Sequence, residues 1–217
     1  MRDYYDKQLE KLNGYVTDMG QLIENAIQNA ITALLAHDKE GAENTIHFDD
    51  EIDRMERDTE NLCLNLLLSQ QPVATDLRLV SAALKMVTDM ERIGDHAADI
   101  SEITLILAGS GFPESLNSIE KMAEETIFMV KESVDAYVQR SVQKAIEVIH
   151  HDDVVDNYFV DIKKLIIWQI NENIQNGEQA ADILMIAKYL ERIADHAVNI
   201  AEWVLFYITG EHPEVPV

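Results

Sequence analysis

The sequence predicts an all-α protein made of two tandem three-helix bundles, with six long helices related by an internal repeat. Residues that break helices are rare, with 8 glycines and 4 prolines in 217 residues. The chain is instead rich in Ala, Leu, Ile, Glu and Lys, which favour helices. The repeat is directly visible, because ERIGDHAADISE (residues 91–102) returns as ERIADHAVNIAE (residues 191–202) with eight of twelve positions identical.

The first bundle is expected over residues 1–108. Its helices are expected over about 3–36, 38–69 and 73–107. Asp38 suits the N-cap of the second helix. The pair Gln71-Pro72 should end that helix, because proline disfavours helical geometry at the preceding residue.

The stretch AGSGFPES, residues 108–115, holds two glycines and a proline and marks the boundary between the halves. The second bundle is expected over residues 115–210. Its helices are expected over about 115–139, 142–176 and 178–209. Ser141 takes the matching N-cap position, Gly177 should separate the last two helices, and Gly210 should end the last one.

The composition excludes several classes of function. Forty acidic residues against 17 basic ones give a net charge of −23, so nucleic acid and anionic lipid would be repelled. No stretch approaches the roughly 18 apolar residues of a membrane span, and the start of the chain is too charged for a signal peptide. The lone Cys63 cannot form an internal disulfide and is expected to be a buried structural thiol. We therefore expect a cytoplasmic protein that reaches a membrane only through partners.

Acidic residues form rows at helical spacing. Residues three or four apart share a helix face, and residues 86–104 carry an apolar stripe with an acidic row nearly opposite. The stripe is Met86, Met90, Ile93, Ala97, Ile100 and Thr104, and the row is Glu91, Asp95, Asp99 and Glu102. The second half repeats the row as Glu191, Asp195, Asn199 and Glu202.

The middle helix of each half carries a second row. In the first half it is Asp49, Asp53, Glu56 and Glu60; in the second half it keeps Asp152 and Asp156 and changes to Phe159 and Lys163. Like charges at this spacing destabilise a helix by about 0.2–0.5 kcal/mol per pair. Clustered carboxylates are hard donors for Mg²⁺, Mn²⁺, Ca²⁺ or iron. A solvated face and a surface for a basic partner are the alternatives.

Other polar residues point to structure rather than catalysis. His96 and His196 lie beside the acidic rows and are expected to pack or form hydrogen bonds rather than to bind metal. Arg92 and Arg192 are expected to pair with acids of a neighbouring helix. There is no phosphate loop or nucleophile motif, and the Glu-x-x-His pair of di-iron enzymes occurs once, at Glu147. We therefore expect no enzymatic activity.

Taken in order and twice over, these motifs resemble the PhoU family, the accessory regulators of bacterial phosphate uptake. They are D-x-x-x-D, the connection QPVATDLR, and E-R-I-G-D-H, repeated as D-x-x-x-D and E-R-I-A-D-H. The resemblance covers nearly the whole chain and implies two tandem three-helix bundles.

The resemblance implies metal clusters, multinuclear and of iron or zinc, with manganese, calcium, magnesium or nickel as alternatives. The matching positions are Asp49, Asp53, Glu91, Asp95, Asp152, Asp156, Glu191 and Asp195, with Asp99 extending the first row. Asn199 departs from Asp99, which weakens the second set.

The resemblance also implies partners: the ATPase of the phosphate ABC transporter, a phosphate-sensing histidine kinase, and a second copy in a homodimer. The expected function is an adaptor that restrains uptake when phosphate is plentiful. The alternatives are a metal-storage bundle or carboxylate-bridged metalloenzyme, and a structural bundle whose acids are only solvated.

Overall fold

The computed structural model describes residues 2–69, 74–108 and 116–211. The described residues form six long α-helices and no strand, which confirms the all-α prediction. The helices are α1 Arg2–Ala36, α2 Lys39–Ser69, α3 Ala74–Leu107, α4 Leu116–Gln139, α5 Val142–Glu172 and α6 Gly177–Thr209, with a short 3₁₀ turn at Ile174–Asn176. The breaks predicted at Gln71-Pro72 and within 109–115 lie outside the described residues.

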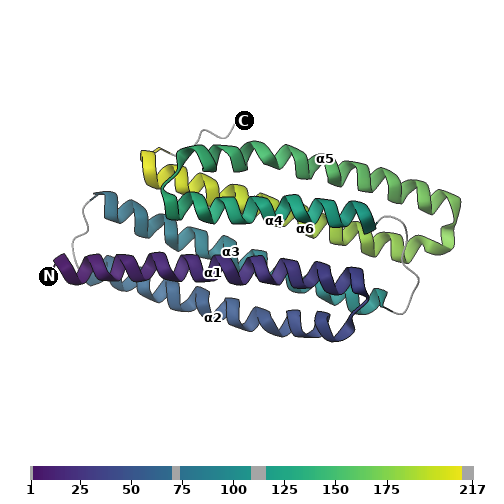
Figure 1. The fold of residues 1–217 in the computed structure, drawn as a ribbon, viewed down its shortest axis with the longest axis horizontal. Coiled ribbons are helices and arrows are strands. Elements are labelled where there is room, and N and C mark those ends of the chain that lie inside the picture. Colours follow the sequence, from purple (N-terminus) through teal and green to yellow (C-terminus); the bar gives the residue numbers. More distant parts are fainter. Residues whose placement is uncertain (1, 70–73, 109–115, 212–217) are drawn as a thin grey trace.

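The helices form two layers that run across both halves. Helices α2, α3, α6 and α5 pack side by side in that order, and α1 and α4 cover one face of this row (Figure 1). The halves join where α3 meets α6 and where α1 meets α4. The face of the four-helix row that is turned away from α1 and α4 is therefore open to solvent.

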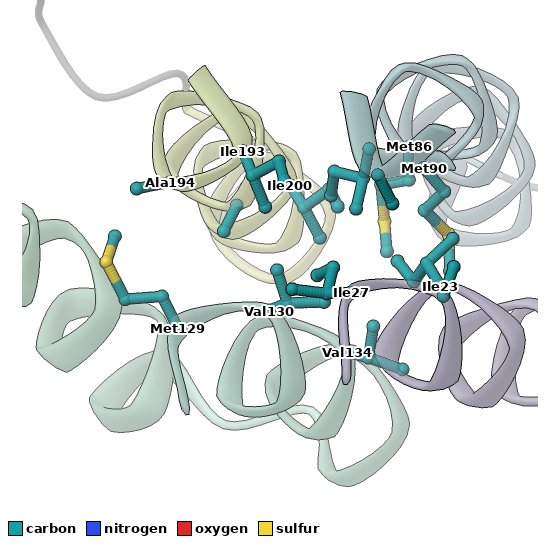
Figure 2. Close-up of a cluster of buried hydrophobic side chains, with 14 of the residues drawn as sticks. Ile23, Ile27, Met86, Met90, Met129, Val130, Val134, Ile193, Ala194 and Ile200 are labelled. Atoms are coloured by element: carbon teal, nitrogen blue, oxygen red, sulfur yellow. The ribbon is translucent and has the colours of Figure 1, made fainter. Parts of the chain in front are cut away.

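Apolar residues from both halves share a single core. Figure 2 shows the junction of the halves, where α1, α3, α4 and α6 meet. The contributing side chains include Ile23, Ile27, Met86, Met90, Val130, Val134, Ile193 and Ile200. Each fully buried side chain of this size stabilises the fold by about 1.5–3 kcal/mol. The core thus fixes the two bundles relative to each other.

The first turn in each half is built in the same way. His37 and Arg140 have φ of 56° and 53°, the left-handed conformation that ends many helices. The N–H groups of His37 and Asp38 donate to Leu34 and Ala33, and those of Arg140 and Ser141 donate equivalently one repeat later. The duplication therefore extends to the hydrogen bonds of the turns.

Two predicted helix ends are confirmed and two are wrong. The Ser141 hydroxyl accepts from the N–H of Lys144 at 3.2 Å, and Gly210, with φ of 82°, donates to Phe206 as a C-terminal cap. However, α5 ends at Glu172 rather than at 176, and Gly177 is the first residue of α6 rather than the separator. The break is made by Asn173, whose side chain accepts from the N–H of Gln175 at 3.1 Å and so replaces helical hydrogen bonding.

Candidate metal-binding patches

The first acidic patch lies between α2 and α3 on the open face of the four-helix row. It contains Asp49, Asp53 and Glu56 from α2 and Glu91 and Asp95 from α3. The negative charges interact across the two helices. The charge of Asp95 raises the pKa of Asp49, and the charge of Asp53 raises the pKa of Glu91. All four residues that sequence reasoning assigned here are therefore brought together.

Two carboxylates of this patch are hard to ionise. Burial, and then the charge of Asp95, raises the pKa of Asp49 to about 6. Burial, and then the same Asp95, raises the pKa of Glu91 to about 7. Oδ1 of Asp49 is buried without a hydrogen-bond partner among the described residues, and Oε2 of Glu91 is buried with only an ion pair to Nε of Arg92 at 3.4 Å. A cation would supply the interaction that Oδ1 of Asp49 lacks, and it would share Oε2 of Glu91 with Arg92.

Arg92 supplies part of the counter-charge, in a way that differs from the prediction. Its Nη1 lies 2.9 Å from Oδ2 of Asp95, and its Nε lies 3.4 Å from Oε2 of Glu91. Both ion-pair partners are on its own helix, whereas a neighbouring helix was expected, and the charge of Arg92 also opposes the rise in the pKa of Glu56 on α2. The spacing i, i+3 explains the correction, because it brings Arg92 and Asp95 to one helix face. With 55% of its side chain exposed, Arg92 stays at the rim.

A glycine lies where α2 approaches α3 closely. A Cβ at Gly94 would lie 2.8 Å from Oδ1 of Asp49 and 2.9 Å from Cδ1 of Ile52. Beside it is an open hollow of about 440 Å³, which Asp49, Asp95 and Asp99 line together with Glu102 and His96. Asp99 thus adjoins the first acidic patch, as predicted.

The second acidic patch occupies the equivalent place between α5 and α6. It contains Asp152 and Asp156 from α5 and Glu191 and Asp195 from α6. Burial raises the pKa of Asp152 to about 6, followed by the charges of Asp156 and Asp195. Burial and then Glu191 also raise the pKa of Asp195. The second set of predicted residues is therefore brought together as well.

Lys188 is a residue of the second acidic patch that sequence reasoning missed. Its ammonium forms an ion pair with Glu191 and lies 5.4 Å from the centre of the Phe159 ring. It also lowers the pKa values of Asp156 and Asp195, against the effect of burial. The i, i+3 spacing from Glu191 was the available signal.

The histidines form hydrogen bonds where α3 meets α6, as predicted. Nδ1 of His96 lies 3.2 Å from Oδ2 of Asp99, and Nδ1 of His196 lies 2.8 Å from Oδ1 of Asp89. Asn199 donates to the same oxygen of Asp89 at 3.1 Å. An aspartate at position 199 would repel Asp89, which gives a physical reason for the departure from the repeat.

The donors of both patches fit cations of the hard, oxygen-binding class. All of them are carboxylates, and the first patch contains a buried oxygen, Oδ1 of Asp49, that has no hydrogen-bond partner among the described residues. In the described part of the chain, no three His, Cys, Asp or Glu side chains already surround one point where an ion would sit. Binding would therefore require carboxylates of the two facing helices to turn toward each other.

Known proteins share this architecture along the whole chain. The model of the PhoU domain matches twice, at residues 16–104 and 119–204. A phosphate-specific transport system accessory protein PhoU homolog from Clostridium acetobutylicum is 36% identical over 99% of this chain and 98% of its own length. The homolog from Rhizobium meliloti is 30% identical over 97% and 89%.

Solved structures agree with these relatives. The crystal structure of PhoU from Pseudomonas aeruginosa superposes with a TM-score of 0.92 at 30% identity and covers 95% of this chain and 100% of that chain. The phosphate transport system regulatory protein PhoU from Streptococcus pneumoniae superposes with a TM-score of 0.89 at 30% identity and covers 97% and 100%. In the described ranges, no helix carries an apolar run long enough to cross a bilayer.

Proposed function

The chain belongs to the PhoU family, and we propose that it is a cytoplasmic adaptor that restrains inorganic phosphate uptake when phosphate is plentiful. It would bind the ATPase of the phosphate ABC transporter and pass phosphate status to a phosphate-sensing histidine kinase. It would act as a homodimer and reach the membrane only through these partners. The function is regulatory rather than enzymatic.

One observation carries this proposal: each half places an acidic patch on the same open face of the four-helix row. The two patches are held at a fixed separation because the halves share one core. A rigid face with two negative centres suits a partner that carries matching basic residues, since complementary charge speeds and orients association.

Metal ions are part of the proposal. Asp49, Asp53, Glu91 and Asp95, with Asp99 beside them, would hold a cluster in the first acidic patch. Asp152, Asp156, Glu191 and Asp195 would hold one in the second. Iron or zinc is expected first, and manganese, calcium, magnesium or nickel are alternatives. A bound cluster would offset the carboxylate repulsion and change the charge that a partner meets.

The partner proposal is tested by pull-down of the transporter ATPase in high phosphate. We expect association at micromolar protein, and its loss in Asp49→Asn/Asp53→Asn combined with Asp152→Asn/Asp156→Asn. The matched control, Glu10→Gln/Asp18→Asn combined with Glu120→Gln/Glu124→Gln, neutralises the same number of exposed acids on α1 and α4 in the other layer. Absence of binding by the wild type, or equal loss in the control, would contradict the proposal.

The buried Oδ1 of Asp49, which has no hydrogen-bond partner among the described residues, also favours a second candidate, a metal-storage bundle or a carboxylate-bridged metalloenzyme. Elemental analysis combined with oxidase and phosphatase assays separates the candidates. An adaptor should bind few ions and turn nothing over, whereas a store should bind many and an enzyme should show turnover.

A further inference from the structure

Two histidines from opposite halves of the chain meet where α3 packs against α6. The ring centroids of His96 and His196 are 5.6 Å apart, with 33° between the ring planes. His96 is buried and His196 is half-buried. The pair therefore lies in the seam between the halves, and His96 also lines the hollow beside the first acidic patch.

Each ring is held at one nitrogen by an aspartate. Nδ1 of His96 is 3.2 Å from Asp99 on its own helix, and Nδ1 of His196 is 2.8 Å from Asp89 on the other helix. A histidine that donates its Nδ1–H to a carboxylate presents Nε2 as its lone-pair donor. This carboxylate–histidine pairing is the usual support of an imidazole that binds a metal ion.

The separation of the rings suits a shared ion. Metal–nitrogen bonds of about 2.0–2.1 Å in tetrahedral geometry place the centroids of two bound imidazoles about 5 Å apart. The two aspartates place negative charge next to the rings. This charge opposes that of Arg192, which lowers the pKa of His96. The observed distance between the ring centroids, 5.6 Å, is about 0.6 Å longer than this spacing.

We propose that His96 and His196 form a two-imidazole site for a late first-row divalent ion, of the class of Cu²⁺, Ni²⁺ and Zn²⁺. Imidazole nitrogen suits these ions, whereas the all-carboxylate patches suit harder ones. Two protein donors, with solvent completing the coordination, make a weaker site than a four-ligand structural zinc site. A bound ion would join α3 to α6 and so strengthen the contact between the halves.

Electron paramagnetic resonance of Cu²⁺ tests this site, because coupling to imidazole nitrogens counts the histidines bound. The full chain receives less than one equivalent of Cu²⁺ at pH 7.5, with excess Mg²⁺ present for the carboxylates. We expect two coupled imidazoles in the wild type and one in His196→Gln. The matched control His150→Gln removes an exposed histidine of α5 and should keep both.

A wild-type spectrum with one imidazole or none overturns the proposal, and so does a His196→Gln spectrum that keeps two. His96→Gln should reproduce the loss from the other helix, with circular dichroism confirming the fold of each variant. Asp49→Asn/Asp53→Asn should leave the spectrum unchanged. Failure of the acidic patches to bind metal is thereby distinguished from failure of the histidine site.

Discussion

The two acidic patches sit on equivalent helices, yet the residues around them differ in charge. Around the first patch the repeat places Glu56, Glu60 and Asp99; around the second it places Phe159, Lys163 and Asn199. The second patch also contains Lys188, where the first half has Thr88. Duplication thus kept the backbone positions of the carboxylates and changed their electrostatic surroundings, which should make the first patch the stronger cation site.

The largest expected effect comes from removing carboxylates of the first acidic patch. Asp49→Asn/Asp53→Asn should weaken the tighter class of Mn²⁺ sites by about 100-fold or more, because two of the proposed ligands are lost. Asp152→Asn/Asp156→Asn should affect only a weaker class. Isothermal titration calorimetry of metal-free protein measures both. Equal losses of Mn²⁺ affinity in the two variants would show that the first patch is not the stronger cation site.

Lys188 provides a way to make the second patch resemble the first. Lys188→Thr installs the residue found at position 88 and frees Glu191 from its ion pair. Losing one nearby positive charge should raise Mn²⁺ affinity of the second patch by about 10-fold, equivalent to roughly 1.4 kcal/mol. Lys121→Thr, at an exposed position of α4, is the matched control. An unchanged affinity in Lys188→Thr would show that the lysine does not compete with metal.

The metal-free protein should lose stability as pH rises from about 5 to 7.5. In the unfolded chain, Asp49 and Glu91 ionise near their ordinary pKa of about 4, but in the folded chain their pKa values are about 6 and about 7. The folded state therefore binds more protons in this range, and its free energy of unfolding falls as pH increases.

Thermal unfolding in chelator checks this pH dependence. The Tm should fall by roughly 2–5 °C across the range, and Glu91→Gln should flatten the slope because the residue that retains its proton longest is gone. Glu147→Gln, on the exposed face of α5, serves as the control. A Tm that rises with pH in the chelated wild type would contradict the assigned pKa directions.

Features that depend on residues close together in the sequence could be predicted, whereas contacts between residues far apart in the sequence could not. The acidic rows and the cap at Ser141 depend on residues within about one helical turn, and both were predicted. The break at Asn173 was misplaced because a glycine and an asparagine four residues apart offered competing signals. The bond between His196 and Asp89 spans 107 positions, and only the packing of α3 on α6 creates it. The partners of Arg92 lay within reach of the sequence, since Asp95 is three residues away.

The smallest expected effect comes from Gly94, where the two halves of the chain differ in the size of the residue beside the patch. Position 94 is Gly in the first half, and its counterpart Ala194 is fully buried in the second. Gly94→Ala gains about 1 kcal/mol of helix propensity, but its methyl group would meet Asp49 and Ile52 at under 3 Å. Oδ1 of Asp49 and Cδ1 of Ile52 are the far ends of side chains that can turn, and Cγ2 of Ile52, at 3.1 Å, would have to move by only a few tenths of an ångström. The free energy of unfolding should therefore change by less than about 1 kcal/mol. Urea denaturation measures that change, and calorimetry with Mn²⁺ should show weaker binding because Oδ1 of Asp49 is displaced. A large loss of stability would instead mean that α2 and α3 cannot separate at this point, and that the close approach at Gly94 is required for folding as well as for the patch.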